Sequence, residues 1–401
     1  MHNIKKIIFC ILLMLSFQGK SQKVSSFEEV NVQSYALYEK ASWHELLTFG
    51  KTAIAANQDF PMLRLRMGYA AFMLTNFSDA LIHYEKVLEN DSYNSTAHYY
   101  IWLCRNYLNQ TELATLEIPF LSDEVLVKEK KKGFAITGVS IESSFKNTNI
   151  TTRGNTFYQF LGIQNRFGNK LYMDQAAVFL NQGFQTTQTI MPGPPGSGNS
   201  AKKDSTFKQS EYYNKLSYSL SNRLQLKIAY HYTNTSFGQI NYQNQTAFAA
   251  LRYHANYFDI QAEGIYSTMF DSSISQMSLQ IAYYPLGNMN LYGFSTATIR
   301  NRPSGSAFNY KQVIGAKITN GLWLEANATF GKFRDLFEND AKYIYNAPDE
   351  NLFKGGLVSY ISLSTKCTLE LGYTLEQRAI YSNPSRLFNQ HSITGGLSWK
   401  F

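Results

Sequence analysis

The sequence predicts an α+β multidomain protein, in which N-terminal α-helical repeats are followed by an antiparallel transmembrane β-barrel of about 14 strands. Three observations predict it. Apolar residues recur at helical spacing up to about Val127 and at every second position after Lys132. The alternating segments run for about 10–13 residues, long enough to cross a bilayer at a tilt. Short and long polar links follow one another between these segments, as in barrels with tight turns at one end.

The composition fits a chain in which polar and apolar residues are interleaved one by one. Aromatic residues make up 15% and charged residues 16%, against roughly 25% charged residues in ordinary soluble proteins. The mean hydropathy is nevertheless only −0.28. The net charge of +8 is scattered along the chain, and the dense run at residues 128–132 is interpreted as a solvated basic linker. We therefore expect no nucleic-acid partner.

Residues 1–21 have the pattern of a secretory signal peptide. A basic stretch, MHNIKK, precedes the apolar run IIFCILLMLSF and a small-residue ending at Gly19 and Ser21. The apolar run is too short for a stable membrane helix, which needs about 20 residues. Cys10 lies inside that run without the context of a lipoprotein site. We expect cleavage after Ser21 and export, and no later segment is a candidate membrane helix.

The predicted helical domain covers residues 22–127. Gly68 is followed twelve residues later by Ala80, then by Tyr84 and Val87 at helical spacing. This pattern resembles a tetratricopeptide repeat (TPR), and the resemblance implies that these four residues pack two antiparallel helices together. Ser92 replaces the proline that usually ends such a repeat. The flanking segments 30–40, 43–56 and 95–108 have repeat-like length with weaker signatures, and a generic helical bundle is the alternative.

Residues 133–401 form the predicted barrel. In the segment 224–232, Leu226, Ile228 and Tyr230 alternate with the polar residues Lys227 and His231. Three further segments, 258–266, 322–330 and 367–376, repeat the pattern. Charged residues of both signs follow the polar face, namely Lys227, Arg252, Lys311, Lys317, Lys354, Asp259, Glu263, Glu325, Glu370 and Glu376. Such a lumen can hold an aqueous channel or be packed shut by ion pairs.

The links between strands favour a barrel over a soluble β-sandwich, whose strands average about 5–6 residues. Short links are predicted at 168–170, 221–223, 254–256, 287–288, 320–321 and 365–366. Long polar links are predicted at 147–154, 186–207, 300–306, 335–350 and 380–389. This asymmetry is typical of outer-membrane barrels, with tight periplasmic turns and long external loops.

The chain ends with HSITGGLSWKF, in which Ile393, Leu397, Trp399 and Phe401 share a face that we expect to contact lipid. This strand must pair with the first one, near 134–145, because an open edge is costly in a bilayer. The order of signal peptide, repeat-like helices and barrel ending in Phe resembles the YaiO-type outer-membrane proteins of Gram-negative bacteria. More loosely, it is similar to larger TPR-barrel exporters of poly-N-acetylglucosamine. The resemblance implies that Trp399 and Phe401 form the signal for the barrel-assembly machinery.

No residue pattern predicts catalysis, a cofactor or a metal site. A barrel hydrolase would need His231 beside a residue such as Ser362, Glu263, Glu325 or Glu370, and a lumenal charge network is the simpler interpretation. His44, His83 and His98 lack metal-ligand spacing and are expected at the surface or in a groove. The loop at 193–200 lacks the lysine of a phosphate-binding loop. Cys104 and Cys367 are expected to be buried and unpaired.

Three functional hypotheses follow. In the first, a non-enzymatic outer-membrane protein docks a protein partner through its periplasmic TPR-like domain, in surface glycan export or secretion. In the second, the barrel is a pore for a glycan or a small solute. In the third, the barrel holds a hydrolase site. The expected partners are outer-membrane lipid, the barrel-assembly machinery, a periplasmic protein and a glycan.

Overall fold

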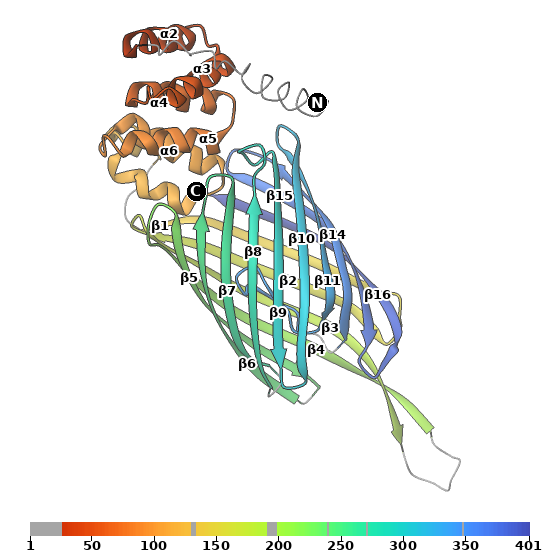
Figure 1. Ribbon diagram of the computed structural model, residues 1–401. Coiled ribbons are helices and arrows are strands. Elements are labelled where there is room, and N and C mark those ends of the chain that lie inside the picture. The colour runs from red at the N-terminus through yellow and green to blue at the C-terminus, as the bar shows by residue number, and fades with distance from the viewer. Residues whose placement is uncertain (1–25, 130–133, 191–198, 239, 270–271, 347–348) are drawn as a thin grey trace, which may run out of the picture.

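The computed structural model describes residues 26–129, 134–190, 199–238, 240–269, 272–346 and 349–401. The predicted signal peptide, Lys130–Lys132 of the predicted linker and most of the loop at 193–200 lie outside these ranges. Helices stack beyond one end of a closed β-barrel, and the first helices lie farthest from it (Figure 1). The prediction of a helical region followed by an antiparallel 14-stranded barrel is confirmed.

The N-terminal part is entirely helical. Ser26 begins the first helix with a capping box to Glu29, and the side chains of Asn76 and Asn94 cap two later helices. Among the described helices, none is both long and apolar enough to cross a membrane. The elements are α2 (Phe27–Glu39), α3 (Trp43–Ala55), α4 (Pro61–Met73), α5 (Phe77–Leu88), α6 (Ser95–Tyr107), α7 (Thr111–Ala114), η1 (Thr115–Phe120) and α8 (Asp123–Glu129).

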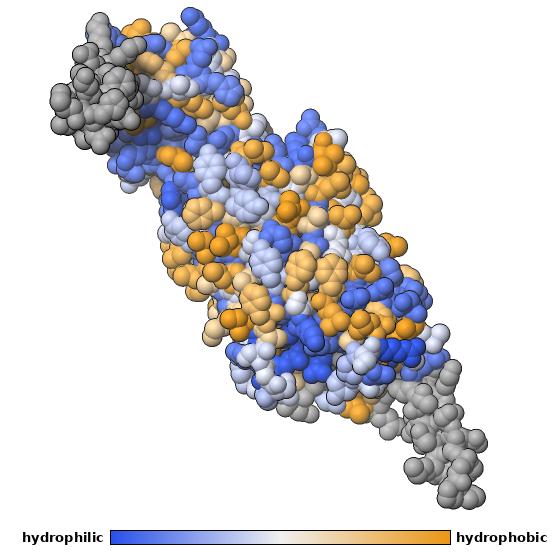
Figure 2. Space-filling view, turned by 45° about the vertical axis from the view of Figure 1, so that its right-hand side comes forward, coloured by the Kyte–Doolittle hydropathy of each residue, from blue (hydrophilic) through white to orange (hydrophobic). Residues whose placement is uncertain are grey.

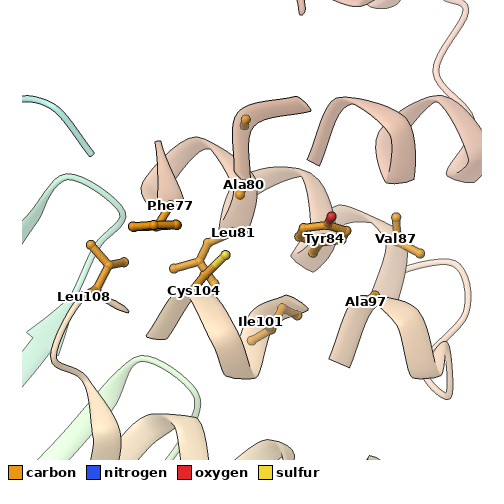
Figure 3. Close-up of a cluster of buried hydrophobic side chains, with 10 residues drawn as sticks. Phe77, Ala80, Leu81, Tyr84, Val87, Ala97, Ile101, Cys104 and Leu108 are labelled. Carbon is orange, nitrogen blue, oxygen red and sulfur yellow. The ribbon is translucent and has the colours of Figure 1, made fainter. Parts of the chain in front are cut away.

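A core of buried side chains holds α4, α5 and α6 together (Figure 3). Ala80, Tyr84 and Val87 of α5 are fully buried in it, and Cys104 of α6 fills a neighbouring position. Gly68 of α4 lies directly on the Tyr84 ring, where an added Cβ would come within 2.8 Å of Cζ. The structure therefore brings together the four residues that the repeat-like pattern singles out.

The histidines of this domain correct the sequence analysis. His44 is exposed, but His83 and His98 are buried rather than at the surface. Arg64 donates from Nη1 to His83 Nδ1 at 3.1 Å, and His98 Nδ1 lies 2.6 Å from Glu117 Oε2. Each imidazole thus has a polar partner in the interior, which makes its burial tolerable.

His83 predicts a pH dependence for the helical domain. Burial and the nearby Arg64 charge lower its pKa from 6.5 to about 4. Because the folded pKa lies below the unfolded one, the unfolded state binds more protons, and stability falls as the pH drops from about 6.5 toward about 4. The expected slope is about 1.4 kcal/mol per pH unit. Urea unfolding of the full-length protein, followed by helical circular dichroism, measures it.

The matched control is His83→Gln, whose side-chain oxygen still accepts from Arg64 but does not titrate. Its free energy of unfolding should change less than that of the wild type over the same pH range. An identical pH profile for the two proteins would contradict the role assigned to His83.

The barrel closes when the last strand pairs with the first. In the described chain 14 antiparallel strands form one ring, with Ile141 opposite Leu397 and Phe145 opposite Ile393 at the closure. The strands are β1 (Phe134–Thr148), β2 (Arg153–Phe167), β3 (Leu171–Ile190), β4 (Asn199–Ser219), β5 (Leu224–Phe237), β6 (Ile240–His254), β7 (Phe258–Met269), β8 (Ser272–Tyr283), β9 (Leu291–Arg302), β10 (Gly305–Thr319), β11 (Leu322–Phe333), β14 (Glu350–Ser362), β15 (Cys367–Ile380) and β16 (Asn383–Lys400).

Apolar side chains are spread over the outer wall of the barrel, as the alternation predicts, with paler and hydrophilic residues among them (Figure 2). Leu226 and Ile228 of β5 are exposed, whereas Gln225, Lys227 and His231 of the same strand are buried inside. On β16, Ile393 is 66% exposed and Leu397, Trp399 and Phe401 are also exposed. In a closed ring, all strands hydrogen-bond their backbone N–H and C=O groups to neighbouring strands, and exposed apolar side chains suit a lipid environment. The chain thus has the architecture of an outer-membrane β-barrel.

Several predicted long loops are instead strand. The link between β9 and β10 is only residues 303–304, and that between β15 and β16 is residues 381–382. Strands β3 and β4 continue to Ile190 and Asn199 through residues predicted as loop. In these hairpins the backbones of the two strands stay paired to the strand ends. The chain is therefore extended there although its residues are mostly polar and do not alternate with apolar ones. The link at 335–350 is indeed long, but it turns into the barrel.

Candidate functional site in the barrel lumen

The link between β11 and β14 folds into the lumen as a small hairpin. Its strands are β12 (Phe337–Glu338) and β13 (Tyr343–Ile344), and we call residues 337–344 the inward hairpin. At its tip Asn339, Asp340 and Ala341 all have left-handed backbone conformations, with φ of 53°, 58° and 62°. Such conformations cost about 1–3 kcal/mol each and persist where surrounding contacts hold them.

Asp340 ties the tip of the inward hairpin to one side of the barrel. Its Oδ2 lies 3.0 Å from Lys215 Nζ on β4 and 3.0 Å from Lys227 Nζ on β5. Gln261 of β7 donates to Oδ1 at 2.9 Å, and the Tyr213 hydroxyl donates to the Asp340 carbonyl. Side chains from β4, β5 and β7 therefore converge on one carboxylate.

Glu338 ties the inward hairpin to the other side. Its Oε1 lies 2.7 Å from Lys311 Nζ on β10, and its Oε2 lies 2.9 Å from Lys354 Nζ on β14. The Tyr343 hydroxyl donates to Glu142 on β1 at 3.1 Å. Because these partners surround the hairpin, it spans the lumen instead of lying along one wall.

The inward hairpin also packs on an apolar patch inside the lumen. Phe337 and Ala341 are buried against Phe248, Ile265 and Ile274 of β6, β7 and β8. The sequence analysis expected a consistently polar inner face, and this part of the prediction is wrong. The apolar side chains point inward because they cover the hairpin, which supplies the second half of their core.

Ion pairs hold both ends of the link that carries the hairpin. Arg302 Nη2 lies 2.6 Å from Asp335 Oδ2, and Arg153 Nε donates to Asp349 Oδ2 at 2.6 Å. These arginines come from β9 and β2. The link therefore enters and leaves the lumen at fixed positions on the barrel rim.

A cavity of about 1230 Å³ lies beside the inward hairpin. Small or polar residues of β14–β16 and β1 line its far wall, among them Gly372, Thr374, Ser392, Thr394 and Ser144. It is also lined by Asn106, Leu108, Asn109, Gln110, Thr111, Glu112 and Leu113, which belong to the helical domain. The lumen and the helical domain thus share one polar space.

The helical domain is fixed to the end of the barrel where the longest connection is the seven-residue link 284–290; the opposite end has several two-residue links but also the 16-residue link 334–349. We call the first of these the short-turn end. Ser78 donates from its backbone to the Gly287 carbonyl at 3.0 Å, and Asn288 Nδ2 donates to the Thr75 carbonyl at 2.9 Å. Arg223 pairs with Glu85 of α5. These turn residues belong to the β4–β5 and β8–β9 connections, so α5 lies across the rim.

A second contact reaches into the barrel mouth. Gln225 of β5 donates from Nε2 to Glu112 Oε2 at 2.8 Å, and Thr115 donates to the Asn169 carbonyl at 2.9 Å. Glu112 follows α6, so the end of the helical stack lies over the lumen. Contacts on both α5 and α7 fix the orientation of the domain and not just its position.

The structure does not assemble the hydrolase candidates. His231 is fully buried, Nε2 lies 2.8 Å from Glu211 Oε2, and Nδ1 donates to the Ala341 carbonyl at 2.8 Å. His231 therefore anchors the inward hairpin, and its described hydrogen bonds include none to Ser362, Glu263, Glu325 or Glu370.

No group of three or more His, Cys, Asp or Glu side chains is placed to hold a metal in the described parts of the chain. Cys104 is buried, but Cys367 is partly exposed, which corrects the expectation that both are buried; neither forms a disulfide.

The sequence analysis placed Lys227, Lys311 and Lys354 on the polar face but missed Glu338 and Asp340. Those two acids fall in a polar link, where a solvated position is the default expectation. The apolar residues Phe337 and Ile344 in the same link could have indicated that it is buried, because large apolar side chains are uncommon in solvent-exposed loops.

Comparisons with known proteins find similarity among solved structures. No protein-family model matches the sequence, and no curated protein matches it. Among solved structures, the toluene transporter TodX of Pseudomonas putida has a TM-score of 0.44 at 8% identity, covering 71% of this chain and 90% of that one. A Pseudomonas aeruginosa FadL homologue has a TM-score of 0.40 at 10% identity, with 68% and 91% covered. The translocator domain of the autotransporter NalP from Neisseria meningitidis has a TM-score of 0.32 at 10% identity, and the match covers 74% of this chain and 99% of that one.

Proposed function

We propose that this chain is a non-enzymatic outer-membrane conduit for polar solutes, whose helical domain lies in the periplasm at the mouth of the barrel. The observation that carries the proposal is the cavity of about 1230 Å³ shared by the lumen and residues 106–113 of the helical domain. A solute that reaches the helical domain therefore enters the lumen without crossing a wall. The inward hairpin narrows the path beyond that point.

The periplasmic placement is supported by the short-turn end. Outer-membrane barrels carry their long loops on the external side, and the helical domain contacts the end opposite the 16-residue link 334–349. The resemblance to YaiO-type proteins and to TPR-barrel exporters agrees with this orientation. It also makes a surface glycan a candidate cargo.

A protein partner for the helical domain is the second candidate function. Aromatic rings follow one another in contact along the stack, from Tyr38 and Trp43 through Tyr69 and Tyr100 to Tyr84. Tyr38, Trp43, Tyr69 and Tyr100 are only partly buried. Partly exposed aromatic rings are enriched where proteins bind one another, so this row is where we propose that a TPR-like domain docks its partner.

Planar-bilayer recording of the full-length protein tests the conduit. Wild type should give small current steps, and replacement of residues 337–344 by a short Gly-Ser linker should enlarge them. Absence of current from both proteins would overturn the conduit and leave partner docking as the function.

Gly287→Ala tests the part played by the helical domain. Gly287 has φ of +65°, and a Cβ there would fall 1.9 Å from Asn76 Oδ1. The substitution should loosen the domain from the rim and enlarge the current steps. Gly168→Ala is the matched control, since Gly168 has φ of +63° at the same end but a Cβ would meet nothing within 4 Å. Equal steps from the two variants would show that the domain does not cover the path.

A further inference from the structure

The inward hairpin places two carboxylates in positions that a soluble anion could occupy. Asp340 lies between Lys215 and Lys227, and Glu338 lies between Lys311 and Lys354. The lysines come from four different strands of the barrel wall, whereas both acids come from one short link. The wall thus supplies two pairs of cations and the hairpin supplies one anion to each pair.

The lysines depend on the hairpin for their counter-charges. In the described ion pairs, Lys311 and Lys354 contact Glu338 alone, and Lys227 contacts Asp340 alone. The other hydrogen bond of Lys227 goes to the uncharged Gln261, at 2.9 Å. Lys215 differs, because Asp174 also lies 2.9 Å from its Nζ. Without the hairpin, three of the four lysines lose their described carboxylate partner.

Burial makes that loss costly. The Lys227 side chain is only 7% exposed, and the Glu338 side chain is 9% exposed. A charge left unpaired in such surroundings destabilises a protein by several kcal/mol. The hairpin can therefore leave only if water or another anion reaches the lysines in its place.

The cavity beside the hairpin gives such an anion access. Lys215, Lys227, Lys311 and Lys354 all line it, together with Glu338 and Asp340 themselves. The left-handed backbone at the tip stores conformational energy that is released when the contacts of Asp340 break. The hairpin is thus held by the contacts that a competing ligand would replace.

We infer that the four lysines form a binding site for a solute carrying two anionic groups, such as two carboxylates or phosphates, and that Glu338 and Asp340 occupy it in the absence of that solute. This inference rests on the proposed conduit and names the class of its substrate. Each group of the solute would sit between one pair of lysines, as each carboxylate of the hairpin does. Binding of the solute and opening of the path would then be the same event.

The test uses the full-length protein and 1,6-hexanediol bisphosphate, a flexible probe whose two phosphate groups are separated by a six-carbon chain. The double variant Glu338→Gln/Asp340→Asn keeps the shape of the hairpin but removes both charges. In a potassium chloride gradient its reversal potential should shift toward that of chloride, because the lysines are no longer neutralised. The bisphosphate should block its current at concentrations that leave the wild type open.

Substitutions of the lysines locate the site. Adding Lys227→Ala or Lys311→Ala to the double variant should weaken the block about tenfold each, the effect of losing one charge-assisted contact. Lys366→Ala is the matched control, because Lys366 lines the same cavity at the β14–β15 turn, away from the hairpin. Its addition should leave the block unchanged. A block equally weakened by all three changes would overturn the inference.

Two further measurements distinguish a failure of the inferred binding site from a failure of the proposed conduit. If the double variant does not assemble, the variant with residues 337–344 replaced by a Gly-Ser linker should show the same shift and block. Calorimetric titration of either variant with the bisphosphate measures the site without any current. Binding without current would overturn the conduit but keep the site. Current with an unshifted reversal potential and no bisphosphate binding would overturn the site but keep the conduit.

Discussion

Replacing Leu279 by Arg should lower the free energy of unfolding of the barrel in lipid vesicles by about 2–4 kcal/mol. Leu279 lies in the middle of β8 and is 47% exposed on the outer wall, between Ala262 of β7 and Ala297 of β9. A guanidinium at this point must enter the hydrocarbon or distort the bilayer around it. Urea unfolding measures the loss, followed by the fluorescence of Trp323 and Trp399 in a background in which Trp43 and Trp102 of the helical domain are replaced by Phe.

Gln280→Arg is the matched control for this experiment. Gln280 is the next residue of β8, and its side chain lines the lumenal cavity, where it donates to Thr296 Oγ1 at 3.3 Å. The same guanidinium placed there remains in a polar space, so the loss should be below about 1 kcal/mol. Equal losses for the two variants would mean that the outer wall does not face lipid.

Deleting Phe401 should reduce the amount of assembled barrel in the outer membrane several-fold, because unassembled barrel is degraded. The Phe401 backbone N–H donates to the Thr137 carbonyl of β1 at 3.1 Å, and its side chain is 61% exposed beside the exposed Trp399. The residue thus contributes to the closing seam and to an exposed aromatic surface, which we propose as the signal for the barrel-assembly machinery. Heat-modifiable migration of membrane fractions on gels measures the folded amount.

Phe401→Tyr separates these contributions from a general effect of changing the terminus. It keeps the aromatic ring and the backbone bond, and its assembled level should match the wild type. A normal level of heat-modifiable barrel after deletion of Phe401 would contradict the assembly role of this residue.

The sequence by itself determined the two parts of the fold and the faces of most strands. In β5, Leu226 and Ile228 face outward and Lys227 faces inward because side chains alternate along an extended chain, and lipid accepts only the apolar set. The closure of β16 on β1 was also predictable, since a barrel in lipid cannot leave an edge unpaired. In the helical domain, the resemblance to a tetratricopeptide repeat singled out Gly68, Ala80, Tyr84 and Val87, because such repeats pack two helices together through residues of these types at these positions.

Only the tertiary structure decided where the link at 335–350 goes, how the helical domain sits on the rim, and which histidines are buried. Asp340 meets Lys227, which is 113 residues away, and Ser78 meets Gly287 on a turn of the barrel. Periodicity reports whether a residue is buried, but it carries no information about which distant residue it contacts. A charged residue in a polar link looks solvated until a barrel wall is built around it. The candidate binding site of this protein consists of such contacts, so it emerged only when the strands were closed into a ring.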